Sequence, residues 1–257
     1  MARASEGGTH WYDQKGSPCY TVIGANGKER NTTLRDARKE NLVPSVTTIL
    51  GVAAKPALEV WKINQALMAA LTLPKNEGES LDDFMARAKQ DSKEQAIEAA
   101  ERGTEIHADI EKGFLGEDDN VAYRAVQEAL EALEPGREWV AEDSFCSEDG
   151  YGGKIDLYAN GVVVDFKTKD NLKGKDPAKL VYDEHGMQLS AYANGLEFLT
   201  PIRISVFVDR ADPSIVLIHK WDAESHQRHL GMFVYLLNYW FLLKKYRPEI
   251  KDAPTLN

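Results

Sequence analysis

The sequence feature that most constrains the fold is a hairpin signal at residues 152–168, G-G-K-I-D-L-Y-A-N-G-V-V-V-D-F-K-T. Asn160-Gly161 between two apolar runs is typical of a two-residue type I′ turn, which requires positive φ at both positions. Such a turn fixes the register of the two strands, and successive side chains then alternate between the two faces. The expected pairs are Ala159–Val162, Leu157–Val164, Asp156–Asp165 and Lys154–Lys167. One face is expected to be apolar (Ile155, Leu157, Ala159, Val162, Val164, Phe166), and the other carries Lys154, Asp156, Tyr158, Val163, Asp165 and Lys167.

The predicted pairing of Asp156 with Asp165 points to a metal site. Like charges directly opposite each other destabilise a sheet, but a divalent cation between them reverses the sign of that interaction. Hard carboxylate oxygens suit Mg2+ or Mn2+. Lys167 lies on the same face, where it can stabilise a hydroxide or a phosphate undergoing attack. The alternative is an ordinary amphipathic hairpin with a solvated, charged outer face.

Two further segments place polar side chains on one helical face. Thr104, His107 and Glu111 share a face in the run R-G-T-E-I-H-A-D-I-E, and Gln188 and Tyr192 share one in H-G-M-Q-L-S-A-Y. Each group is a candidate part of the same site. The alternative is a structural histidine in the first case and ordinary core or surface polar residues in the second.

The predicted elements give an α/β (α+β) fold class, a mixed central sheet flanked by helices with a helical N-terminal annex. Residues 9–43 read as short strands and turns, and Ser45 as the N-cap of one helix running through Trp61 to Leu71. Further helices are expected at 78–115, 121–133, 184–198 and 223–245, and strands at 138–146, 152–159, 162–168, 203–209 and 215–221. We expect a single domain over residues 1–257, with hairpins and a helical annex carrying His107 in 1–135 and the core with its C-terminal helix in 136–250.

Charge and cysteine content narrow the functional classes. The net charge is −10, but residues 77–119 hold 14 acidic against 5 basic residues, so the acidity is concentrated in one helical region. The stretch 167–179 carries five lysines against two aspartates, which leaves room for a phosphate-binding surface. Two cysteines cannot supply the four thiolates of an iron–sulfur cluster. The chain shows no apolar run long enough for a membrane helix and no apolar leader, so a cytoplasmic location is expected.

The motifs together carry a resemblance to a known family. A helical G-T-x-x-H, then G-x-x-D, V-x-D-F-K-T and Q-x-x-x-Y, in this order, resembles the RecB-type exonuclease branch of the PD-(D/E)XK nuclease superfamily. The segment P-S-V-T-T-I-L with K-P-A-L-E-x-W is similar to phage-encoded RecB-like exonucleases and to the mitochondrial genome-maintenance exonuclease. The resemblance covers roughly residues 40–245. It implies a PD-(D/E)XK core, of the restriction-endonuclease type.

The resemblance also implies roles for individual residues. It implies one or two Mg2+ or Mn2+ ions held by His107, Asp156, Asp165 and the backbone carbonyl of Phe166, with Lys167 orienting or activating the attacking water. Gln188 and Tyr192 match the motif that reaches toward the site and the DNA. Secondary candidates are Glu142, near where the family carries a carboxylate, and Glu111; for both, a solvated or salt-bridged surface residue is the alternative. The four-cysteine cluster of some family members is not expected here.

Candidate DNA contacts lie at a helix N-terminus and in the lysine-rich loop. The first group is Ser45, Thr47 and Thr48, and the second is Lys169, Lys173 and Lys175 together with Lys179. Trp61 and Tyr12 are candidates for base stacking. The alternatives are simple helix capping for the first group, a solvated loop for the second and core packing for the two aromatic residues.

The sequence therefore predicts a metal-dependent deoxyribonuclease, a phosphodiesterase that acts on free DNA ends in phage or bacterial recombination, repair or replication. A single-strand-binding or recombination protein is the expected partner, and no P-loop for strand unwinding is present. An endonuclease on the same core, a catalytically inactive DNA-binding protein with a relic nuclease fold, and a hydrolase of small phosphate esters are the alternatives.

Overall fold

The computed structural model describes residues 9–250; residues 1–8 and 251–257 of the predicted unit lie outside the described part. Its centre is a five-stranded mixed sheet in the order β5-β6-β7-β8-β9, in which β7 and β8 run parallel and the other neighbours antiparallel. The strands are β5 (Val140–Cys146), β6 (Gly152–Ala159), β7 (Val162–Lys169), β8 (Ile202–Asp209) and β9 (Val216–Lys220).

Helices cover both faces of this sheet. They are α1 (Leu34–Glu40), α2 (Val46–Leu50), α3 (Pro56–Thr72), α4 (Leu81–Phe114), α5 (Val121–Leu133), α6 (Asp183–Gly195) and α7 (Ser225–Lys244), with a 3-10 turn, η1, at Pro177–Lys179. One hydrophobic cluster joins α4 and α5 to the sheet through Ile106, Ile110 and Val126, and a second joins α2, α6 and α7 to its other face. The expected mixed sheet flanked by helices, with a helical N-terminal annex, is confirmed.

The annex differs from the expectation in two places. The single helix predicted from Ser45 to Leu71 is wrong: α2 ends at Leu50, and α3 starts at Pro56. Proline lacks the N–H that a continuing helix needs and disfavours helical geometry in the residue before it. Helix α1 was not expected; Thr33 and Asp36 form a capping box at its start.

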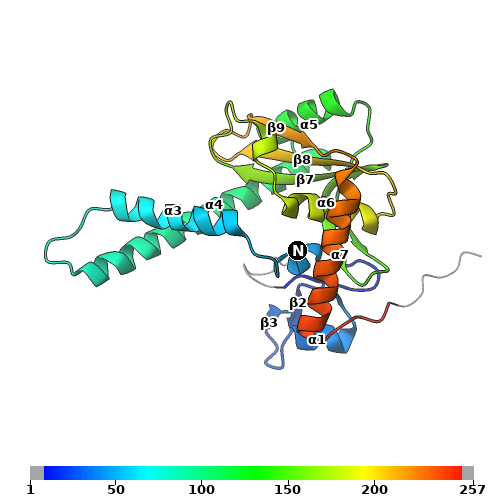
Figure 1. Cartoon of the computed structure of the whole chain (residues 1–257), viewed down its shortest axis with the longest axis horizontal. Coiled ribbons are helices and arrows are strands. Elements are labelled where there is room, and N and C mark those ends of the chain that lie inside the picture. Colours follow the sequence, from blue (N-terminus) through cyan, green and yellow to red (C-terminus); the bar gives the residue numbers. More distant parts are fainter. Residues whose placement is uncertain (1–8, 251–257) are drawn as a thin grey trace, which may run out of the picture.

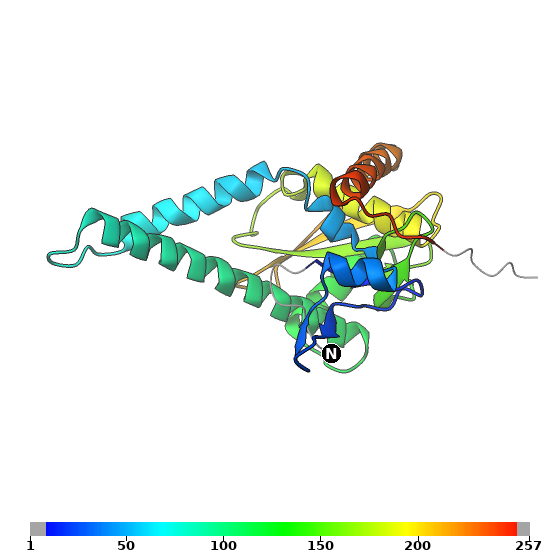
Figure 2. The ribbon, with the colours of Figure 1, turned by 90° about the horizontal axis from the view of Figure 1, so that it is seen from below.

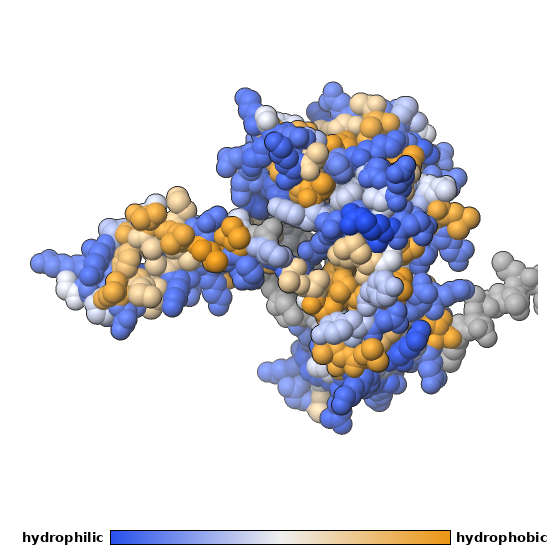
Figure 3. Space-filling model, in the orientation of Figure 1, coloured by the Kyte–Doolittle hydropathy of each residue, from blue (hydrophilic) through white to orange (hydrophobic). Residues whose placement is uncertain are grey.

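Helices α3 and α4 form a long hairpin that projects from the body of the molecule (Figures 1 and 2). Exposed apolar side chains lie along this hairpin, as the orange areas of Figure 3 show; they include Val60, Ile63, Leu67, Leu71 and Met85. The C-terminal half of α4 returns to the sheet and packs against β7. His107 is in this returning half of α4 and therefore lies beside the central sheet.

Smaller N-terminal strands complete the fold. They are β1 (Trp11–Tyr12), paired with β4 (Val43–Pro44), and the hairpin of β2 (Thr21–Ile23) with β3 (Glu29–Asn31). Ser45 also forms a bridge to Gly152 at the start of β6, so this segment lies against the end of the sheet that carries the predicted site. Within residues 9–250, no helix is both long enough and apolar enough to cross a membrane.

Candidate active site

The hairpin β6–β7 has the predicted register near its turn, and it opens farther away. The predicted type I′ turn is wrong, because only Gly161, at φ 74°, has a positive φ and Asn160 does not. Leu157–Val164, Tyr158–Val163 and Ala159–Val162 are paired as expected. The ladder ends there, because Oδ2 of Asp156 accepts a hydrogen bond from the backbone N–H of Phe166 at 2.8 Å. The Phe166 N–H thus bonds to the Asp156 side chain and not to a backbone carbonyl of β6.

This opening corrects two predicted pairs. In the described chain, Asp156 is not the strand partner of Asp165, nor Lys154 of Lys167. Lys154 instead forms an ion pair with Glu142 on β5. Ile155, expected with the apolar face of Leu157, packs in the cluster on the other side of the sheet.

Asp165, Lys167, Gln188 and Tyr192 form one connected polar group. Nζ of Lys167 lies 2.6 Å from the Asp165 carboxylate. Nε2 of Gln188 donates to Oδ1 of Asp165 at 2.7 Å and lies 3.1 Å from the Tyr192 hydroxyl. Gln188 and Tyr192 share a face of α6, as the i, i+4 spacing predicts, and both are buried. Gly153 permits this packing, since a Cβ there would lie 2.8 Å from the Tyr192 ring.

His107 reaches the same place from α4. Its ring packs edge-on against Phe166, with centroids 6.0 Å apart, and its Nδ1 lies 4.0 Å from Oδ2 of Asp156. The close approach of α4 to β7 depends on Gly103, one helical turn earlier. A Cβ at that position would lie only 2.7 Å from Oγ1 of Thr168.

Gly103→Ala is therefore expected to destabilise the protein. Alanine in a helix ordinarily gains about 1 kcal/mol over glycine, but overpacking against Thr168 costs about 1–3 kcal/mol. We expect a net fall in the free energy of unfolding, measured by urea denaturation, and recovery in the double variant Gly103→Ala/Thr168→Ala. Gly231 on α7 is the matched control, because a Cβ there meets nothing within 4 Å. A gain at Gly103 equal to that at Gly231 would show that the contact does not constrain α4.

Burial controls the charges of the site. Desolvation raises the pKa of Asp156, and it raises that of Asp165 to about 6 although the neighbouring Lys167 acts in the opposite direction. Desolvation lowers the pKa of Lys167, but Asp165 and Asp156 outweigh it and the net shift is upward. Desolvation, and then the charge of Lys167, lowers the pKa of His107 to about 4. At neutral pH the imidazole is therefore uncharged and has a free lone pair.

These residues line one pocket of about 350 Å³. The pocket holds all six predicted catalytic side chains, and with them Glu142, Ser45 and Thr47. It also holds residues that were not predicted as parts of the site: His10, Tyr20, Gly153 and Lys154. Tyr12 lines it too and is buried, as the core-packing interpretation predicted, while its stacking on a base stays a prediction. The bridge from Ser45 to Gly152 brings this N-terminal wall to the sheet.

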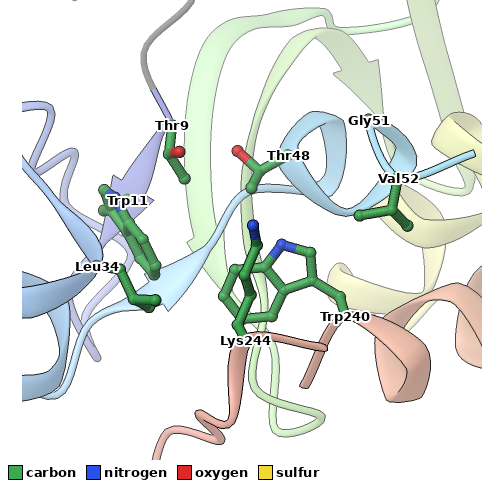
Figure 4. Close-up of a pocket in the computed structure, with 8 residues that line it drawn as sticks. All are labelled: Thr9, Trp11, Leu34, Thr48, Gly51, Val52, Trp240 and Lys244. Atoms are coloured by element: carbon green, nitrogen blue, oxygen red, sulfur yellow. The ribbon is translucent and has the colours of Figure 1, made fainter. Parts of the chain in front are cut away.

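Glu111 and Thr48 do not line this pocket. Glu111 is half-buried on α4, and its charge is one of the causes that raise the pKa of Asp156. Ser45, which does line the pocket, also caps α2 by accepting from the Thr48 N–H at 3.0 Å, as the capping interpretation predicted. Thr48 lines a second pocket of about 370 Å³ (Figure 4); its lining comprises Thr9, Trp11, Leu34, Thr48, Gly51, Val52, Trp240 and Lys244.

The candidate lysines at the end of β7 and in the loop after it also lie outside the pocket lining. Nζ of Lys169 lies 4.9 Å from the centre of the Tyr182 ring. Lys175 donates to the carbonyl of Asp170, Lys173 is exposed, and Lys179 is exposed in η1.

The donor set fits a divalent cation in its chemistry but is not assembled around one point. Within residues 9–250, no three His, Cys, Asp or Glu side chains converge as metal ligands. However, Oδ2 of Asp165 is buried and accepts no hydrogen bond among the described residues, and its close partner is the Lys167 ammonium, with Nζ 2.6 Å away. In a strand, the N–H and C=O of one residue point to the same side, so the Phe166 carbonyl lies on the same side of β7 as its N–H, which donates to Asp156. Two carboxylates, a carbonyl and a neutral imidazole suit Mg2+ or Mn2+.

The comparisons with known proteins are sparse. No family model and no curated protein matches this sequence. Among solved structures, a candidate exonuclease from Eubacterium rectale is similar over 59% of this chain and 72% of its own, with 14% identity and a TM-score of 0.39. The structure of SSO0001 is similar over 70% of this chain and 86% of its own, with 18% identity and a TM-score of 0.29. Likenesses this distant carry no argument about activity.

Proposed function

We propose that this chain is a Mg2+- or Mn2+-dependent deoxyribonuclease of the PD-(D/E)XK type, from its RecB-like branch, which hydrolyses phosphodiester bonds at DNA ends. The observation that supports this most is the pocket in which Asp156, Asp165 and Lys167 lie beside a neutral His107. A buried carboxylate, Asp165, and a half-buried one, Asp156, both have raised pKa values, and strongly perturbed titratable groups in a pocket commonly mark a functional site. DNA is the proposed substrate, in recombination, repair or replication, with a single-strand-binding or recombination protein as a possible partner.

In this proposal, Asp156, Asp165, His107 and the Phe166 carbonyl hold the cation. A bound Mg2+ or Mn2+ would polarise the phosphate and lower the pKa of a water molecule. This leaves the protein to supply the ligands, the orientation of the substrate and the remaining charge stabilisation.

The chain's own residues have separable tasks. Lys167 brings a positive charge to the Asp165 carboxylate, where it can stabilise charge developing on a phosphate oxygen. Gln188 holds Asp165 and Lys167 through one amide: its Nε2 donates to Asp165, and Lys167 donates to its Oε1 at 3.4 Å. Burial raises the pKa of Tyr192 well above 10, so its hydroxyl keeps its proton and remains a donor. Lys154 forms its ion pair with Glu142 at the pocket wall.

Cleavage of DNA is expected to require Mg2+ or Mn2+, while Ca2+ supports binding without turnover. Ca2+ accepts more ligands in looser geometry than an in-line displacement demands. The measurement is the initial rate of cleavage of labelled DNA in each cation and in excess chelator. An undiminished rate in chelator would contradict a metal-dependent reaction.

The same assay separates the proposed exonuclease from its alternatives. Linear single-stranded, linear duplex and circular DNA are incubated with the protein in Mn2+, with p-nitrophenyl phosphate as a small-ester control. The proposal predicts degradation of linear DNA, intact circles and no release of nitrophenol. Cut circles would instead indicate an endonuclease, and binding without any cleavage would indicate a relic nuclease fold.

A further inference from the structure

One wall of the candidate active site consists of aromatic rings that the catalytic proposal does not use. The rings of His10 and Tyr20 are stacked, with centroids 4.6 Å apart and an angle of 27° between their planes. Both are half-buried and line the same pocket as the two aspartates. Tyr12 lies behind them, 2% exposed, with its ring edge-on to Tyr20 at 5.7 Å.

The pair is held in place from several sides. The hydroxyls of Tyr12 and Tyr20 share a hydrogen bond of 2.7 Å. The backbone N–H of His10 donates to Oγ1 of Thr48, and its carbonyl accepts from the N–H of Ser45. The carbonyl of Tyr20 accepts from the N–H of Thr32. Rings fixed in this way lose little conformational entropy when a ligand binds, so their contacts with the ligand contribute more fully to the affinity.

The pocket is therefore divided by chemistry. One side carries the carboxylates of Asp156 and Asp165 with the ammonium of Lys167. The aromatic side is uncharged, because burial lowers the pKa of His10 and raises those of Tyr12 and Tyr20. With a divalent cation held by the two carboxylates, the first side accepts an anionic group. A ligand that matches both sides then has an anionic group at one end and a flat π system at the other, which is the description of a nucleotide.

We propose that the His10–Tyr20 pair is a stacking platform for the base of the nucleotide whose phosphate lies at Asp156 and Asp165. This deepens the proposed nuclease function and rests on it. The pocket, of about 350 Å³, is at the small end of ligand sites, roughly 300–1,000 Å³, which favours one nucleotide over a base pair. The substrate at the point of cleavage is then an unpaired nucleotide, and a duplex end enters only after fraying, which costs a few kcal/mol.

The test measures binding without catalysis. Internally labelled short single-stranded oligonucleotides are titrated with the protein in Ca2+, which is expected to support binding without turnover, at low salt, and fluorescence anisotropy gives the affinity. One oligonucleotide has all its bases; in the other, both terminal nucleotides are abasic, so the digestion polarity need not be known. The variants are Tyr20→Ala, His10→Ala and the ring-preserving Tyr20→Phe, and the matched control is Tyr235→Ala, an 80% exposed tyrosine on α7.

The expected result is a loss that depends on the terminal base. Parent protein, Tyr20→Phe and Tyr235→Ala should bind the complete oligonucleotide about tenfold more tightly than the abasic one, a typical effect of one base stack. Tyr20→Ala and His10→Ala should lose most of this difference. Blunt hairpin DNA should compete clearly less well than single strands for the parent protein.

Two outcomes would overturn the stacking platform. One is a parent protein that binds complete and abasic ends equally well. The other is a Tyr20→Ala variant that weakens both oligonucleotides by the same factor, which is the behaviour of a purely structural residue. Thermal melting confirms that each variant is folded, and His10→Ala repeats the test if Tyr20→Ala is not. A base preference without cleavage in Mg2+ or Mn2+ would contradict the proposed nuclease alone, whereas cleavage without a base preference would contradict the platform alone.

Discussion

Lys167→Ala is expected to lower the single-turnover rate of DNA cleavage by roughly 10²-fold or more, the scale expected for removing one preorganised charge at a reacting centre. Its affinity for Mn2+ should hold or rise. The reason is that Nζ lies 2.6 Å from the Asp165 carboxylate, so the ammonium and a bound cation compete for the same negative charge. Titration calorimetry with Mn2+ and rapid-quench cleavage measure the two effects separately.

Two other lysine variants make this prediction specific. Lys167→Arg should restore activity only in part, because a planar guanidinium does not replace a compact ammonium. Lys154→Ala removes the other lysine of the same pocket, whose partner is Glu142 rather than Asp165, and should have a much smaller effect on the rate. A Lys167→Ala variant that cleaves at nearly the parental rate would mean that this lysine is only a counterion.

Asp165→Asn is expected to abolish Mn2+ binding and cleavage together, with the rate falling at least as far as in Lys167→Ala. The substitution keeps the shape of the side chain but removes its negative charge and one of the two carboxylate oxygens that suit a cation. It also leaves the Lys167 ammonium without its closest partner. We therefore expect no gain in stability from relieved repulsion between Asp156 and Asp165.

The control for Asp165→Asn is Asp143→Asn on the neighbouring strand β5. Asp143 accepts a hydrogen bond from the Tyr158 hydroxyl, is exposed and does not line the pocket. Its replacement should leave both Mn2+ affinity and the cleavage rate nearly unchanged. Equal losses in the two variants would point to a general effect of net charge and not to a site.

The sequence was sufficient for the centre of the fold because local rules determine it. Asn160-Gly161 fixed the start of the hairpin register, and the confirmed pair Leu157–Val164 follows from it. Helix α5 has its predicted bounds, with Asn120 as N-cap. Likewise, the i, i+4 spacing of Gln188 and Tyr192 placed both side chains on one face of α6.

The parts that could not be predicted depend on contacts between distant segments. Strand spacing could not show that the Asp156 carboxylate accepts the Phe166 N–H and opens the hairpin. Neither His10 nor Tyr20 carries a motif, and both reach the site only because the segment before α2 packs on the end of the sheet. Gly103, in R-G-T-E-I-H, could have indicated the close approach of this helix to a neighbouring element, since a glycine inside a helix commonly marks close packing. Its partner, Thr168, could come only from the structure.

The central claim is that this pocket holds a catalytic divalent cation. The most direct measurement is anomalous diffraction at the manganese edge from crystals soaked in Mn2+. The account predicts a peak in the pocket within coordination distance of the Asp165 carboxylate, also contacting Asp156, and absent from crystals of Asp165→Asn. A DNA-cleaving protein whose crystals show no manganese between these carboxylates would contradict it.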